Sequence, residues 1–68
     1  MKAVSGKEMC GILGSHGWVR DRIRGSHHIY QKPGQVQNVV VPVHGNQTLA
    51  PGTQRAIMRA AGLTEADL

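Results

Sequence analysis

Apolar residues recur at helical spacing near the start of the chain, where Met9, Ile12 and Leu13 fall on one stripe. Ser5 stands where an N-cap belongs, and a glutamate three residues later completes the pattern of a capping box. The pattern predicts a helix over residues 6–15.

A second helix is predicted near the other end, over residues 51–61. Pro51 suits a first turn, and Ile57 with the neighbouring alanines marks a buried side. Gly62 stands where a C-cap glycine belongs. The tail over 64–68 is expected to be frayed or to form a loose last turn.

Three strands are predicted between the helices, over residues 18–24, 27–32 and 37–43. In the first, tryptophan and arginine at even positions alternate with valine, aspartate and isoleucine at odd positions. The other two are rich in valine, isoleucine and tyrosine. Gly25-Ser26 and Pro33-Gly34 supply the turns. The proline in the last strand cannot donate to a ladder, so that strand lies at an edge or ends there.

The order helix, strand, strand, strand, helix predicts an α+β fold. Short turns imply an antiparallel three-stranded sheet, and two amphipathic helices suffice to cover one face of it. This is the α-β-β-β-α architecture of double-stranded-RNA-binding domains. The 68 residues are expected to form one domain, 1–68. Phenylalanine is absent, so the core is expected to be largely aliphatic.

Charge is unevenly distributed along the chain. The net charge is +4, and all eight basic residues precede Ala60. A small basic body favours a polyanionic partner such as nucleic acid, and the alternative is a solvated positive surface. In the first strand Arg20, Arg22 and Arg24 occupy alternate positions, so they are expected to share one face.

Several kinds of protein are disfavoured. A single cysteine, Cys10, allows no intramolecular disulfide, and the chain begins with a segment too polar for a signal peptide. No apolar run reaches the ~20 residues of a membrane span, so a cytoplasmic protein is expected. The spacing of histidines matches no metal motif, and Ser26 lies in no nucleophile-elbow pattern.

Acid–base chemistry on RNA suits the residues better. The 2′-hydroxyl of RNA can attack the adjacent phosphorus, so a protein needs to move protons and hold negative charge. Histidine suits the first task, and arginine or lysine suits the second. His27 follows the basic strand, with Lys32 nearby. The alternative is that His27 and His28 are turn histidines beside a solvated strand.

The chain resembles the HicA toxins of bacterial toxin–antitoxin systems, from about residue 3 to the end. The resemblance is carried by Gly17-Trp18, Arg24-Gly25-Ser26-His27-His28, Val41-Pro42-Val43-His44-Gly45-Asn46, Pro51-Gly52-Thr53, Arg55, Ile57 and Ala61-Gly62-Leu63.

The resemblance implies a double-stranded-RNA-binding-domain-like fold and an mRNA interferase, a ribonuclease that cuts mRNA and arrests translation. It implies that activity depends on the histidine after the Gly-Ser pair, here His27, with no metal and no cofactor. It also implies an antitoxin partner, HicB, that masks this histidine. A link to DNA is expected only indirectly, through the antitoxin.

The expected site is built around His27 as general base, general acid or both. Ser26 is expected to orient it, and His28 or Tyr30 to contact a base or ribose. His44 is either a second acid–base partner or a loop cap. The cations expected to bind phosphates are Arg20, Arg22, Arg24 and Lys32.

The chain departs from the family pattern at Gly11, Gly14 and Asp21. These departures bear on the stability of the fold and on the basic strand, and Gly25-Ser26-His27 is intact. Two other functions stay open: a non-catalytic RNA-binding module of the same fold, and a protein-interaction domain whose basic face meets an acidic antitoxin.

Overall fold

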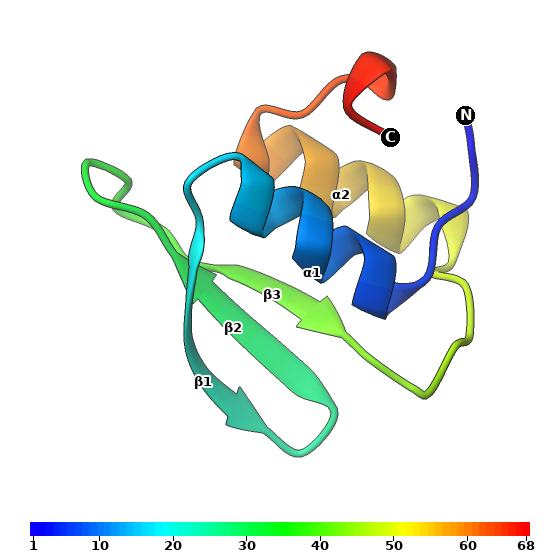
Figure 1. Cartoon of the computed structure of the whole chain (residues 1–68), viewed down its shortest axis with the longest axis horizontal. Coiled ribbons are helices and arrows are strands. Elements are labelled where there is room, and N and C mark those ends of the chain that lie inside the picture. Colours follow the sequence, from blue (N-terminus) through cyan, green and yellow to red (C-terminus); the bar gives the residue numbers. More distant parts are fainter.

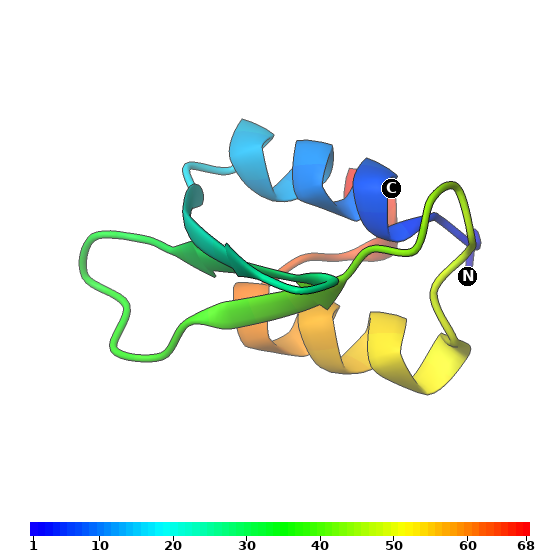
Figure 2. The same ribbon diagram turned by 90° about the horizontal axis from the view of Figure 1, so that it is seen from below.

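The computed structural model describes all 68 residues and contains the predicted α+β fold. Its elements, in chain order, are α1 (Gly6–Ser15), β1 (Val19–Arg24), β2 (His27–Gln31), β3 (Val39–Pro42), α2 (Pro51–Ala61) and a short 3₁₀ turn, η1 (Glu65–Asp67). The strands form one antiparallel sheet in the order β1-β2-β3. Both helices lie on the same side of this sheet (Figures 1 and 2), which confirms the arrangement resembling double-stranded-RNA-binding domains.

The helix boundaries are those that the sequence predicted. At the start of α1 the Ser5 hydroxyl accepts from the Glu8 N–H at 3.0 Å, and the Glu8 carboxylate accepts from the Ser5 N–H at 2.8 Å. At the end of α2, Gly62 has a φ of 70°, in the left-handed region. The three strands are each shorter than predicted, by one to three residues.

The hydrophobic core lies between the helices and the face of the sheet turned toward them. Tyr30 of β2 and Val39 and Val41 of β3 point from that face into the core. The remaining core residues are Val4, Met9, Leu13, Trp18, Leu49, Ile57, Met58 and Leu63. The core is therefore largely aliphatic, as expected, with one tryptophan and one tyrosine within it.

The prediction that three arginines share one face of β1 is wrong, because a β-bulge interrupts the strand. Arg20 pairs with Tyr30, but Arg22 pairs with Ile29, so the bulge leaves Asp21 as an extra residue. Directly opposed residues share a face, and consecutive residues of β2 face opposite ways. Arg20 therefore faces the helix side with Tyr30, and only the other two arginines face away from the helices.

Asp21, the extra residue of the bulge, has its own ionic partner at the surface. Its carboxylate forms an ion pair with the guanidinium of the next residue, Arg22. The acid is thus satisfied at the surface. The other two departures, Gly11 and Gly14, are exposed positions of α1, and no atom lies within 4 Å of where a Cβ would stand.

The C-terminal tail forms a last short turn, η1, which is one of the two expected outcomes, and side-chain contacts hold this turn in place. The Asp67 carboxylate accepts from the N–H of Thr64 at 2.7 Å and caps η1. The same carboxylate lies 3.0 Å from Nε2 of His16, the residue that ends α1. Two side-chain contacts therefore hold the tail that the sequence pattern left loose.

Candidate active site

The candidate site lies at the hairpin that joins β1 and β2. Gly25 has a φ of 59°, and no non-glycine residue of the chain has a positive φ. A two-residue loop in which only the first residue has positive φ is the pattern of a type II′ turn, which suits the twist of a hairpin. His27 is the first residue after this turn, and its side chain is exposed.

The register of the sheet places Arg24 beside His27. Arg24 is directly opposite His27 on β1, and Pro42 is directly opposite it on β3. Opposed side chains share a face at a Cβ separation of about 5 Å. The three ion pairs of the chain involve neither His27 nor Arg24. The hairpin therefore presents an imidazole and an unpaired guanidinium together, on the face turned away from the helices.

Arg22 lies on the same face, two residues from Arg24 along β1, but it is already paired with Asp21. Ser26 is half-buried in the turn, and its carbonyl accepts from the Val43 N–H at 2.7 Å. That hydrogen bond joins the turn to the segment after β3. The expectation that Ser26 orients His27 remains a prediction.

The other two strand residues expected at the site face the helix side. His28 is half-buried and lies opposite Ile23 and Val41. Tyr30 is buried in the core, and burial raises the pKa of its hydroxyl to about 12. Both side chains point to the face opposite the one that carries His27. The expected contact of either residue with a base or ribose remains a prediction.

His44 lies near the hairpin, because the end of β3 meets the start of β2. It follows Val43, whose N–H is bonded to the turn, and its side chain is exposed. Its carbonyl accepts from the Gln47 N–H at 3.0 Å. Both expectations for His44, acid–base partner and loop cap, remain predictions.

Two of the four expected phosphate-binding cations lie apart from His27. Arg20 faces the helix side at Tyr30, where its positive charge partly opposes the rise in the tyrosine pKa. Lys32 follows the far end of β2, about 17 Å along the strand from His27 at the usual rise per residue. Its ammonium lies 5.9 Å from the centre of the Trp18 ring.

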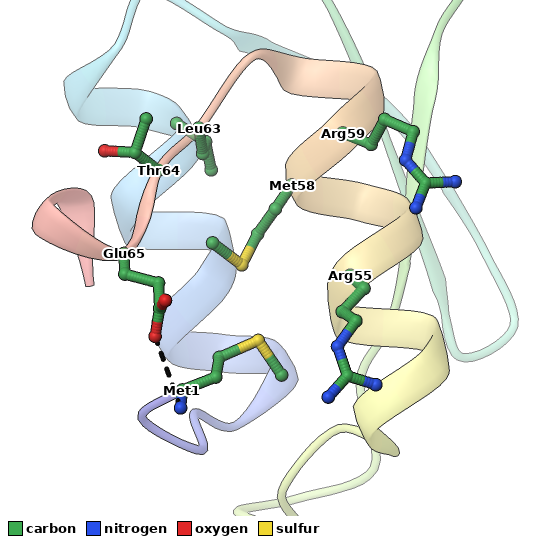
Figure 3. Close-up of a pocket in the computed structure, with 7 residues that line it drawn as sticks. All are labelled: Met1, Arg55, Met58, Arg59, Leu63, Thr64 and Glu65. Atoms are coloured by element: carbon green, nitrogen blue, oxygen red, sulfur yellow. Dashed lines mark ion pairs between the residues drawn. The ribbon is translucent and has the colours of Figure 1, made fainter.

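A separate hollow of about 450 Å³ lies on the helical side of the molecule (Figure 3). It contains no histidine, and its single carboxylate, Glu65, pairs with the N-terminal ammonium at 3.2 Å. It is lined by Met1, Arg55, Met58, Arg59, Leu63, Thr64 and Glu65. The hairpin therefore carries the histidine that this hollow lacks.

No three His, Cys, Asp or Glu side chains of the chain group closely enough to hold a metal ion.

A model of the family described as "HicA toxin of bacterial toxin-antitoxin" matches residues 6–63. The chain belongs to the HicA toxin family. The match covers both helices and all three strands, including the hairpin with His27. As a HicA toxin, the chain is the toxin of a toxin–antitoxin system, which implies a cognate antitoxin. No curated protein matches it. None of its helices is both long and apolar enough to span a membrane.

One feature of this HicA toxin, at the end of the sheet away from the hairpin, was not predicted from the sequence. The segment between β2 and β3, with the last residue of β2, carries the four amide side chains Gln31, Gln35, Gln37 and Asn38. Three of these line a hollow beside the loop. The concentration of amides was the available signal, and no catalytic motif uses it.

Proposed function

We propose that this HicA toxin is a metal-independent endoribonuclease that cuts mRNA in the cytoplasm, arrests translation and is neutralised by a HicB-type antitoxin. The observation that carries the proposal is the exposed pair of His27 and Arg24 on one face of the hairpin. Such a pair supplies a group that moves protons and a fixed positive charge, the two things that RNA transphosphorylation requires.

The proposed reaction begins with attack of a ribose 2′-oxygen on the adjacent phosphorus. The new bond joins O2′ to phosphorus, and the bond from phosphorus to O5′ breaks. The products are a 2′,3′-cyclic phosphate and a 5′-hydroxyl. One proton leaves the 2′-hydroxyl and one reaches the 5′-oxygen. His27 serves one or both transfers, with His44 as the candidate for the other.

The positive charge holds the negative charge that develops on the non-bridging oxygens. Arg24 is placed for this because it lies opposite His27 and has no carboxylate partner. Arg22 extends the same face toward the next phosphate, at reduced strength because of Asp21. Single-stranded RNA is the proposed substrate, since in-line attack needs a flexible backbone.

The test is cleavage of a long unstructured transcript in the presence of EDTA. The purified chain is expected to cut it, and His27→Ala is expected to leave it intact while melting at the temperature of the parent. Comparing His44→Ala decides whether a second histidine takes part.

Other outcomes select the alternative functions. RNA that is bound but never cut by the folded parent would indicate a non-catalytic RNA-binding module. A folded parent that neither binds nor cuts RNA would indicate a protein-interaction domain. If both histidine variants still cut the transcript in EDTA, that result would contradict the proposed mechanism.

A further inference from the structure

A hollow of about 460 Å³ lies at the end of the sheet opposite the hairpin. It is formed by the loop between β2 and β3, which projects from the body of the molecule, and by the adjoining ends of β1 and β2 (Figure 1). Its lining residues are Val19, Gln31, Lys32, Pro33, Gln35, Val36 and Asn38. We refer to this hollow as the loop groove.

Two lining residues of the loop groove share a face of the sheet with His27. Val19 and Gln31 are directly opposed in the register of β1 and β2. Gln31 is four residues from His27 on the same strand, and an even separation places both on one face. The two are about 13 Å apart along the strand. An RNA strand whose phosphate lies at the hairpin can therefore follow β2 and place a neighbouring nucleotide in the groove.

The lining of the loop groove has the chemistry that an unpaired nucleobase requires. Val19, Pro33 and Val36 offer apolar surface for a ring, and Val36 is 98% exposed. Amides from Gln31, Gln35 and Asn38 each provide a hydrogen-bond donor and an acceptor, as base edges do. The lining contains no carboxylate that would repel a phosphate.

The lining of the groove also includes a cation, and its loop contains a defined turn. Lys32 is half-buried, with its ammonium over the Trp18 ring. The Gln35 N–H donates to the Lys32 carbonyl at 3.0 Å, and Gly34 takes a φ of 85°, so a turn closes the loop beneath the amides.

From these observations we infer that the loop groove binds an unpaired base of the RNA substrate, a short way along the strand from the cleaved bond, and so selects the sites that are cut. The inference rests on the proposed ribonuclease function. It assigns cleavage to the hairpin and base selection to the opposite end of β2.

The experiment measures base selection separately from cleavage. Single-stranded oligonucleotides that differ in one base are titrated into the His27→Ala protein, and cut sites of the parent are mapped on a long transcript. Replacing Gln31, Gln35 and Asn38 together by alanine is expected to reduce the preference for one base by about tenfold, as loss of a good base-edge contact does. The maps should then show cuts at sites that the parent leaves intact.

Gln37→Ala is the matched control, because Gln37 belongs to the same exposed loop but does not line the groove. It is expected to keep the base preference of the parent. Unchanged preference in the triple variant would overturn the inference, as would an equal loss in the control. If the parent never cuts RNA, the proposed function fails but the inference can still be tested. The base preference is then measured from the binding of the oligonucleotides alone.

Discussion

At the scale of single residues, the charge offered to a phosphate depends on whether an arginine already has a partner. Arg22 and Arg24 face the same way from β1, but the Asp21 carboxylate pairs with the first of them. The bulge that allows this contact could not be predicted, because the residue pattern of β1 does not show which of its residues lacks a partner on the next strand. The bulge is identified only by the residues of β2 that lie opposite each residue of β1.

Replacing Asp21 by asparagine is expected to free Arg22 for RNA. A released guanidinium that contacts one more phosphate makes the slope of log affinity against log salt steeper by about 0.7 for single-stranded RNA. The measurement is binding of a labelled oligonucleotide by the His27→Ala protein over a range of salt concentrations. Adding Arg22→Gln to the asparagine variant should restore the original slope, and an unchanged slope in the first variant would contradict the expectation.

At the scale of elements, features set by residues close in the sequence were predicted more accurately than features set by residues far apart in it. Helix bounds were predicted to the residue because their signals are local, such as the capping box of α1 and the glycine after α2. Strand ends and the order of the tail depend on distant partners, and these were predicted less well. The position of His27 directly after a turn is local and was predicted, whereas the loop groove combines residues of two strands and a loop.

Replacing Gly6 or Gly11 of α1 by alanine is expected to change the free energy of unfolding in opposite directions. A Cβ on Gly6 would overlap the carbonyl oxygen of Pro42, where the helix begins against the end of β3. Gly6→Ala should therefore lower the free energy of unfolding by about 1–3 kcal/mol, as overpacking does. Gly11 has open space, so Gly11→Ala should raise it by up to about 1 kcal/mol through helix propensity. Urea denaturation of both variants tests the pair, and equal effects would refute it.

The contact between α1 and η1 is expected to depend on pH through two groups. The Ile12 carbonyl at 2.9 Å, followed by the Asp67 carboxylate, raises the pKa of His16 above 6.5. The Thr64 N–H is the main cause that lowers the pKa of Asp67 below 3.8. A raised histidine pKa stabilises the fold below 6.5 and loses its effect as pH rises through the raised value. A lowered carboxylate pKa stabilises above 3.8 and loses its effect as pH falls through the lowered value.

The tail should therefore dock best in mildly acidic solution. An NMR titration of the His16 ring measures this directly, and Asp67→Asn should shift its midpoint to lower pH. A midpoint at 6.5 or below in the parent, unmoved by Asp67→Asn, would show that the contact does not form in solution.

At the scale of the whole molecule, basic side chains occupy two sides. Arg24 lies by His27 on the sheet face, whereas Arg55 and Arg59 line the hollow on the helical side (Figure 3). The net charge of +4 is therefore spread over both sides of the molecule. Only charge close to the reacting phosphate can stabilise the transition state, since exposed charges beyond about 10 Å are largely screened.

Arg24→Ala is accordingly expected to lower kcat/KM for RNA cleavage by about 100-fold, the scale for losing one group that stabilises developing charge. Arg55→Ala removes the same charge from the other side and should leave cleavage nearly unchanged. Initial rates on one transcript compare the two. A similar loss in both variants would mean that overall charge, and not the hairpin geometry, governs activity.

Under the proposed function, the exposure of His27, outside the core and beyond a two-residue turn, means that the catalytic group takes no part in holding the fold together. A single change at this position should disarm the protein and leave its scaffold intact. Cells that carry such an allele should still produce a folded protein that competes for the antitoxin through the rest of its surface. Expressed beside an active copy, the disarmed protein should sequester antitoxin and release the active toxin, so that a harmless mutant provokes growth arrest.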